Sequence, residues 1–402
     1  KSVLGDFKAL IAGNDIEIVS VNDIKNIGAE ISAENTISLE SIKGSIWNKS
    51  TARVNDLTYK IDSDIENTAK ISGADISIKA GENYINTAAL VEGKGNVEIA
   101  AKEVVIDTIE MHDYEKQGGK KNYTITESYT NAGSVITGEN ISISADKNIN
   151  IKGSDIIADS ELRLKAGEDV NLTASIDSDY YEHQESKKKS FGRGKLKTEV
   201  KYSTSHNGTN LIGENVSIES GKDTVIIGSN IQAGPEGSAV INAGGDIVQA
   251  AVKDINYSYK KTTKTGFLGL TGSSKSTEQY KEEAVKSNTI SGIGGTSYDA
   301  GSGVLLEGVT VVSTGNITLK GKEVAINPVE TQAYQEEVKK KKGFSSSFSG
   351  GTASFSYGKS KDEIKTTQST NTASTIVSQG KASKFSIMRS LRVDFGITMI
   401  SR

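Results

Sequence analysis

Three histidines and a set of glutamates are the residues of this sequence whose side chains could do acid–base or metal chemistry. The histidines are His112, His183 and His206, and no two of them have the spacing of a metal-binding motif. Hydrolysis or elimination on a polysaccharide would need carboxylates that converge on one groove. The glutamates recur instead at predicted turns, where turn chemistry alone explains them: Glu82, Glu139, Glu168 and Glu214. We therefore predict no catalytic residue, metal site or cofactor, and expect the histidines to be solvated.

Runs of lysine near Tyr and Phe offer a different chemistry, the binding of anions. Such a run can bind anionic glycans or lipid head groups, although it is more often a solvated face. The candidate surface-binding residues are Lys187, Lys188, Lys189, Lys260, Lys261, Lys264, Lys339, Lys340, Lys341 and Lys342.

Charge and composition limit the remaining classes of protein. The 402 residues include 47 Lys and Arg against 51 Asp and Glu, a net charge of -4, which gives no electrostatic case for nucleic acid or a strongly anionic membrane. The absence of Cys excludes disulfides and thiolate sites, and it fits a secreted protein. No apolar run approaches the length that a membrane-spanning helix needs, so we predict no membrane span. The chain begins at Lys1 without Met, and we interpret it as a piece of a longer protein.

A short, regular repeat must position these side chains. Ala12 and Ala33 begin similar segments, and Ile141-Ser142-Ile143 resembles Leu162-Arg163-Leu164 at the same offset along the chain. Apolar and polar residues alternate in each unit, which indicates strands with one buried face. A fixed repeat length is what a coil needs, because equivalent residues must stack from one turn to the next. The sequence therefore predicts an all-β, right-handed parallel β-helix with coils of about 21 residues.

Turn signals separate the strands of each unit. Gly138-Glu139-Asn140 and Gly167-Glu168-Asp169 place Gly where φ is positive and Asn or Asp where it caps a turn. Asn also recurs at the turn positions 14, 35, 83 and 215, so stacked Asn ladders inside the column are a further expectation.

A longer period interrupts the coils. Tyr181, Tyr257 and Tyr334 recur at nearly equal intervals, and each is followed ten positions later by Phe through a lysine run. We expect polar excursions near 112–130, 180–206, 256–288 and 333–370 and interpret them as β-hairpins or ordered arms; the alternative is a charged, disordered loop. The division predicted is one continuous repeat region, 1–380, followed by an atypical segment, 381–402.

These turns, strands and interruptions resemble the haemagglutinin-repeat region of filamentous-haemagglutinin-like exoproteins of two-partner secretion, including contact-dependent inhibition exoproteins. The resemblance covers roughly residues 10 to 380. It implies export from a Gram-negative bacterium through an outer-membrane transporter, a β-helical shaft at the cell surface, and a role in adhesion or in toxin delivery. It identifies no catalytic residue.

Three functions remain as expectations from the sequence. The first is the structural shaft of a surface adhesin or toxin-delivery exoprotein, and the second is direct receptor or glycan binding through the lysine-rich excursions. The third is a polysaccharide-degrading enzyme, because some β-helices have that activity. We expect the chain not to be an enzyme, because its acids follow the turns.

Overall fold

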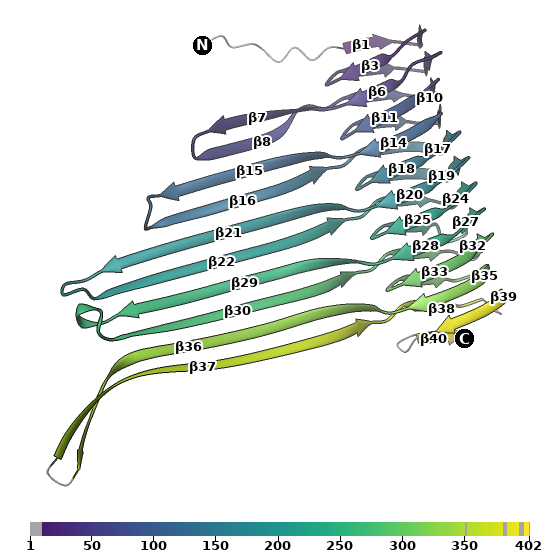
Figure 1. The fold of residues 1–402 in the computed structure, drawn as a ribbon. Coiled ribbons are helices and arrows are strands. Elements are labelled where there is room, and N and C mark those ends of the chain that lie inside the picture. The colour runs from purple at the N-terminus through teal and green to yellow at the C-terminus, as the bar shows by residue number, and fades with distance from the viewer. Residues whose placement is uncertain (1–9, 350–351, 381–383, 394–397, 402) are drawn as a thin grey trace, which may run out of the picture.

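A computed structural model describes residues 10–349, 352–380, 384–393 and 398–401. Across these residues the chain is built of strands, apart from one short 3-10 helix, η1 (Phe267–Gly269). The strands form two sheets, one parallel and one antiparallel, which Figure 1 shows as a stack of coils with long hairpins projecting to one side. The predicted all-β solenoid is confirmed.

Three columns of parallel strands make up the solenoid. The first column contains β1 (Leu10–Gly13), β4 (Glu30–Ala33), β9 (Lys70–Gly73), β12 (Leu90–Gly93), β23 (Asn210–Gly213), β26 (Asn230–Ala233), β31 (Asn288–Ser291), β34 (Thr310–Ser313), β38 (Thr375–Ser378) and β40 (Thr398–Ser401). The second contains β2 (Ile16–Ser20), β5 (Thr36–Ser41), β10 (Asp75–Ala80), β13 (Asn96–Ala101), β24 (Asn215–Ser220), β27 (Ser238–Ala243) and β32 (Gly295–Ala300).

The third column contains β3 (Ile24–Ile27), β6 (Ile46–Lys49), β11 (Asn83–Thr87), β14 (Glu103–Asp107), β18 (Ile149–Lys152), β20 (Val170–Thr173), β25 (Thr224–Ile227), β28 (Ile247–Ala250) and β33 (Gly303–Glu307). Longer strands belong to two columns at once: β17 (Val135–Ala145) and β19 (Asp155–Ala166) to the first and second, β35 (Ile317–Asn327) and β39 (Lys384–Val393) to the second and third.

The core of the solenoid is a continuous apolar column. Ile143 pairs in register with Ile99 on one side and Leu164 on the other, and all three side chains are at most 1% exposed. The alternation seen in the sequence is thus the alternation of inside and outside, and the prediction that Ile143 and Leu164 are buried is confirmed.

An asparagine ladder lies inside this column, but it uses other residues than the turn asparagines. Asn26 donates to Asn48 (2.8 Å), and Asn48 donates to Asn86 (2.7 Å), all three buried in the third column. Asn14, Asn35, Asn83, Asn140 and Asn215 are not buried. Some turn residues instead cap the next coil: the Asn215 Oδ1 accepts from the Ser238 backbone N–H at 3.0 Å. The expectation that the turn asparagines stack inside was therefore wrong.

Five β-hairpins leave the described part of the solenoid, each at the end of a third-column strand. They are β7 (Thr51–Leu57) with β8 (Lys60–Asn67), β15 (Ile109–Gly118) with β16 (Tyr123–Ala132), β21 (Ser175–Lys188) with β22 (Gly194–Asn207), β29 (Val252–Thr265) with β30 (Gly272–Val285), and β36 (Val329–Ser349) with β37 (Thr352–Thr372). We number these hairpins 1 to 5. Hairpins 2 to 5 coincide with the segments near 112–130, 180–206, 256–288 and 333–370, although hairpin 4 ends at Val285, before the end of its segment. The sequence analysis did not single out hairpin 1.

One hairpin follows every second coil, and this spacing lets neighbouring hairpins pair. Two coils advance the solenoid by about 9.6 Å, and the two strands of a hairpin occupy the same width in a sheet. Hairpins therefore join edge to edge into one ten-stranded antiparallel sheet, ordered β37-β36-β30-β29-β22-β21-β16-β15-β8-β7. We call it the hairpin sheet. The longer period seen in the sequence is two coils plus one long hairpin.

Where no hairpin is inserted, the coil closes through a residue with positive φ. Gly153 (φ 50°) and Gly228 (φ 59°) occupy this position after β18 and β25, and Ala88 (φ 46°) occupies it after β11. Glycine suits the left-handed conformation because it has no Cβ, so Ala88 is the strained member of the set.

The described parts of the predicted atypical segment 381–402 pair in parallel with the coils before them. β39 pairs with β35, and β40 pairs with β38. Residues 381–383, 394–397 and 402 lie outside the described residues.

Candidate interaction surfaces of the hairpin sheet

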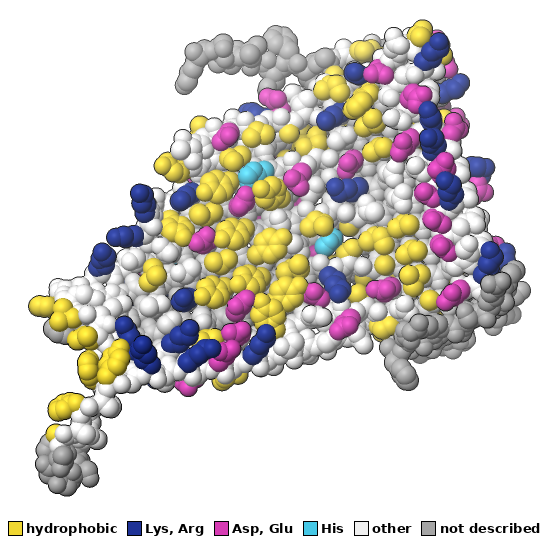
Figure 2. All heavy atoms as spheres, viewed as in Figure 1, with side chains coloured by type: hydrophobic (Ala, Val, Ile, Leu, Met, Phe, Trp, Pro, Cys, Tyr) yellow, Lys and Arg dark blue, Asp and Glu magenta, His cyan; other side chains and the backbone are white. Residues whose placement is uncertain are grey.

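The hairpin sheet is a single layer whose strands run outward from the solenoid (Figure 1). Its cross-strand register places residues from many hairpins in straight rows. The most regular row is aromatic and crosses hairpins 2 to 5: Tyr114, Tyr180, Tyr202, Tyr257, Tyr280 and Tyr334, with Glu127 between the first two. Because side chains alternate along a strand, this row defines one face, which we call the tyrosine face. Figure 2 shows hydrophobic side chains gathered over the middle of the hairpins.

Carboxylates on the tyrosine face accept hydrogen bonds from these phenols. Glu182 accepts from Tyr180 (2.9 Å) and from Tyr123 (2.7 Å), and Glu278 accepts from Tyr334 (2.8 Å). The bond to Glu278, together with burial, raises the pKa of Tyr334 to about 12. The Tyr334 phenol therefore stays protonated, and the bonds donated by Tyr123 and Tyr334 join one hairpin to the next.

Two neighbouring rings of this row, on hairpins 4 and 5, are turned toward each other. Tyr280 and Tyr334 stack with their centroids 5.4 Å apart and their planes 14° from parallel. These two rings thus cover each other's faces and contribute cross-strand packing to a sheet that has no second layer.

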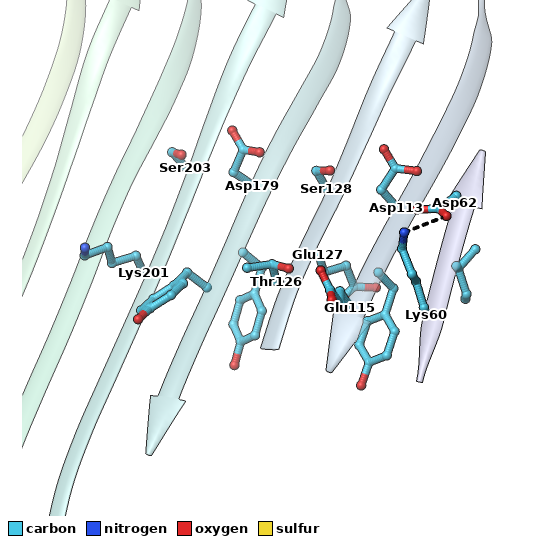
Figure 3. Close-up of a pocket in the computed structure, with 14 residues that line it drawn as sticks. Lys60, Asp62, Asp113, Glu115, Thr126, Glu127, Ser128, Asp179, Lys201 and Ser203 are labelled. Carbon is cyan, nitrogen blue, oxygen red and sulfur yellow. Dashed lines mark ion pairs between the residues drawn. The ribbon is translucent and has the colours of Figure 1, made fainter. Parts of the chain in front are cut away.

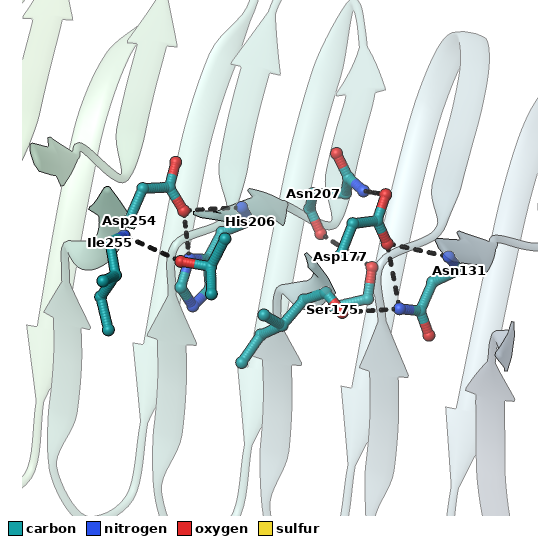
Figure 4. A network of polar contacts seen from close by, with 9 residues as sticks. Asn131, Ser175, Asp177, His206, Asn207, Asp254 and Ile255 are labelled. Atoms are coloured by element: carbon teal, nitrogen blue, oxygen red, sulfur yellow. Dashed lines mark hydrogen bonds and ion pairs between the residues drawn. The ribbon is translucent and has the colours of Figure 1, made fainter. Parts of the chain in front are cut away.

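Aspartates at the roots of the hairpins continue the pairing where the backbone ladder ends (Figure 4). The Asp177 Oδ1 accepts from the Asn131 backbone N–H at 2.8 Å, and the Asp254 Oδ1 accepts from the His206 backbone N–H at 2.9 Å. Each aspartate lies on the first strand of a hairpin and holds the last strand of the preceding hairpin. These residues escaped the sequence analysis, although Asp recurs two residues into β21 and β29.

The histidines take part in contacts of the hairpin sheet. The His112 Nε2 lies 2.9 Å from the Glu127 Oε1, and the His112 ring stacks on Tyr129. His183 contacts the Thr124 hydroxyl at 3.0 Å. His206 contacts Asp254 at 2.7 Å and its side chain is only 12% exposed, so the expectation of a solvated residue was wrong for His206.

A shallow cavity of about 470 Å³ lies over hairpins 1 to 3 on the face opposite the tyrosine face (Figure 3). Its floor is polar: Asp62 forms an ion pair with Lys60 at 2.9 Å, and Asp113 accepts from the Ser63 backbone N–H at 2.8 Å. Within the described residues, no three His, Cys, Asp or Glu side chains are grouped so that they could hold a metal ion.

Three of the four turn glutamates contact a neighbouring coil through their side chains. Glu82 pairs with Lys102 at 2.8 Å and Glu168 with Lys222 at 3.0 Å, while the Glu214 carboxylate accepts from the Glu236 backbone N–H at 2.9 Å.

The ten predicted lysines lie in the outer parts of hairpins 3 to 5, but they do not share one face. Lys188, Lys261, Lys340 and Lys342 are in register with the tyrosine face. Lys187, Lys260, Lys264, Lys339 and Lys341 alternate with them and belong to the opposite face. Lys189 lies at the tip of hairpin 3, beyond the end of β21.

Several of these lysines stand directly opposite another lysine. Lys340 is paired with Lys361, and Lys342 with Lys359, across the strands of hairpin 5. Only some of the ten have a carboxylate partner among the described residues: Lys187 pairs with Glu185, Lys260 with Glu199, and Lys339 with Glu337. Lys359 and Lys361 were missed because their place opposite Lys342 and Lys340 depends on the hairpin register.

Coils with regularly inserted hairpins define the class of protein, a β-solenoid repeat protein. Residues 115–266 match the family model of the hemagglutinin repeat. Over 86% of this chain, the sequence is 27% identical to the 16S rRNA endonuclease CdiA of Enterobacter cloacae. Over 49% of this chain, it is 30% identical to a tRNA nuclease CdiA of Escherichia coli. The chain is thus similar to the haemagglutinin-repeat region of filamentous-haemagglutinin-like contact-dependent inhibition exoproteins, and the resemblance seen in the sequence is confirmed.

The chain spans 13% and 6% of these two relatives. No solved structure matches. No helix among the described residues is long and apolar enough to span a membrane.

Proposed function

We propose that this chain is a shaft segment of a large exported bacterial surface protein, used in adhesion or in presenting a toxin to a neighbouring cell. The uninterrupted parallel pairing of the three columns carries this proposal, because each coil adds a fixed rise of about 4.8 Å without ending the core. The relatives, named for nuclease activities, are far longer than this chain, in keeping with a role at a distance from any catalytic region.

Export through an outer-membrane two-partner secretion transporter, exposure at the cell surface and the absence of enzyme activity belong to the same proposal. So does the division of the chain into one continuous repeat region, 1–380, and a final segment, 381–402. The family relationship supports the first two, and the turn position of the glutamates supports the third.

A duplication tests the shaft. Residues 210–287 comprise two coils and hairpin 4, so duplicating them preserves the match between coils and hairpins. We expect a folded particle that is longer by about 9.6 Å in small-angle X-ray scattering. Duplicating residues 230–287 instead adds one coil with two hairpin strands and should disturb the hairpin sheet. Equal behaviour of the two variants would contradict the proposal.

We propose, as a second function, that the lysines of hairpins 3 to 5 bind an anionic partner at a cell surface. Like charges directly opposite each other in a sheet are destabilising, and the pairs Lys340–Lys361 and Lys342–Lys359 are of this kind. An anion between them would relieve the repulsion. Binding of soluble dextran sulfate that weakens with salt, and is reduced by Lys340→Gln with Lys342→Gln, tests this function.

A further inference from the structure

The tips of hairpins 3 and 4 and the adjoining part of hairpin 5, from Lys342 outward, form a connected edge, which we call the distal rim. The Leu268 backbone N–H at the tip of hairpin 4 donates to the Phe191 carbonyl at the tip of hairpin 3 (3.0 Å). The Lys342 ammonium of hairpin 5 donates to the Gly269 carbonyl of hairpin 4 (2.8 Å). The tips of hairpins 3 and 4 are therefore tied together, and hairpin 5 is tied to the tip of hairpin 4 in mid-strand, from where β36 and β37 continue farther outward (Figure 1).

Large apolar side chains are exposed along this rim. Phe191 is 70% exposed, Leu268 64% and Phe355 77%. Phe344 and Tyr357 face each other across hairpin 5 with ring centroids 5.1 Å apart, and both are more than a third exposed. A cluster of exposed apolar side chains on a protein surface marks an interaction site.

Two of these residues have an unfavourable backbone as well. Phe191 (φ 58°) and Leu268 (φ 49°) are in the left-handed region, where bulky L-residues are rare. Glycine would relieve the strain at either position. Strain of this kind points to a function of the side chains themselves.

Lysines lie directly behind the apolar tips, and the acids of the tyrosine face lie nearer the solenoid. Lys188 and Lys189 precede Phe191 in hairpin 3, and Lys342 precedes Phe344 in hairpin 5. The net charge of the whole chain is -4, but the basic and acidic residues of the hairpins lie in different places, so the rim itself is basic.

We infer that the distal rim docks on an anionic lipid bilayer, with Phe191, Leu268 and Phe344 entering the head-group boundary and the lysines pairing with lipid phosphates. This inference rests on the second proposed function and specifies its partner. A soluble polyanion would engage the lysines but leaves the apolar side chains in water. A bilayer satisfies both, because apolar burial and attraction to anionic head groups add at its surface.

Binding of the whole chain to protein-free vesicles tests the inference. We expect sedimentation with vesicles of phosphatidylcholine and phosphatidylglycerol, weakened by salt, and little with phosphatidylcholine alone. The double variant Phe191→Gly with Leu268→Gly should bind these vesicles about tenfold less, yet bind dextran sulfate as before and melt no lower. The matched control is Ile364→Ser, an apolar residue 65% exposed in mid-strand, whose loss should leave vesicle binding unchanged.

The outcomes separate the proposals. Binding of dextran sulfate without any binding of vesicles would overturn the lipid inference and leave the lysine site standing. Binding of neither would overturn both. Undiminished vesicle binding by the double glycine variant would overturn the role of the apolar rim.

Discussion

The solenoid and the hairpin sheet are both built of strands, yet different forces hold them. In the solenoid, Ile143 is stacked between Ile99 and Leu164 and all three are buried, so apolar burial dominates. The hairpin sheet is a single layer, and its tyrosines pack laterally while their hydroxyls bond to carboxylates. The solenoid has its own core, whereas the hairpin sheet depends on cross-strand pairs and on the spacing that the solenoid imposes.

The comparison shows how the strands of a one-layer sheet are kept in register. The coils advance by one strand spacing each, so a two-stranded hairpin on every second coil meets its neighbour without strain. Aspartates at the roots, such as Asp177 and Asp254, hold the strands together where they leave the coils.

The largest expected effect is a charge placed in the solenoid core. Ile143→Asp puts an unpaired carboxylate in the apolar column and should destabilise the chain by more than about 4 kcal/mol. Glu139→Gln, at the exposed turn just before, should change the melting temperature little. Thermal unfolding followed by circular dichroism measures both, and the reverse ranking would contradict the assignment of the inner face.

Removing a hairpin should damage the hairpin sheet more than the solenoid. Replacing residues 174–208 by a single glycine reproduces the turn at Gly228 and joins Thr173 to Thr209. It leaves β16 and β29 three strand spacings apart, because the two strands β21 and β22 that lay between them are gone. Hydrogen exchange should become faster in β16 and β29 and stay slow in the third column.

We expect this effect because the excursions are not independent of one another. The excursions are hydrogen-bonded to one another, as in the ten register pairs between β22 and β29. If exchange in β16 and β29 were unchanged by the deletion, the pairing between hairpins would contribute nothing to their stability.

Two substitutions at the coil-closing turn should change the stability of the chain in opposite directions. Gly153→Ala places a Cβ 2.4 Å from the Ser175 Oγ at positive φ and should destabilise the solenoid by about 2 kcal/mol. Ala88→Gly, at the equivalent turn, should stabilise by up to about 1 kcal/mol because it removes strain. Chemical denaturation measures both, and a shared sign would show that the two turns are not equivalent.

The smallest expected effect is an acid-dependent loosening of the hairpin sheet. Hydrogen bonds from Lys275 and Lys339 lower the pKa of Glu337 from 4.5 to about 2. The folded pKa lies below the unfolded one, so this contribution is complete above about pH 4.5 and is lost as the pH falls toward 2.

Hydrogen exchange between β30 and β36 should therefore accelerate over this pH range, since Lys275 and Glu337 lie on these two strands. Glu337→Gln removes the titrating group and should flatten the pH dependence. The same acid profile in the variant and the parent chain would assign the loosening to other carboxylates.

Local periodicity in the sequence was enough to predict the coil. Apolar and polar residues alternate around Ile143 and Leu164, and the same alternation recurs in the next coil. This identifies strands with a buried face, because a shift of one residue would turn the apolar side chains of that strand out of the core. The Tyr-to-Phe frame likewise located hairpins 3 to 5. Hairpin 1, at residues 51–67, lacks that frame and is short, so no repeat revealed it.

The sequence by itself determined the coil length, the inward and outward alternation and the places where hairpins 2 to 5 leave the solenoid, since these depend on neighbours along the chain. Only the tertiary structure decided that hairpins pair with each other, that Lys340 stands opposite Lys361, and that Phe191 meets Leu268 at the rim. Those contacts join residues far apart in sequence. They arise because the rise of two coils equals the width of one hairpin. This match depends on how the coils stack, and no single segment of the sequence shows it.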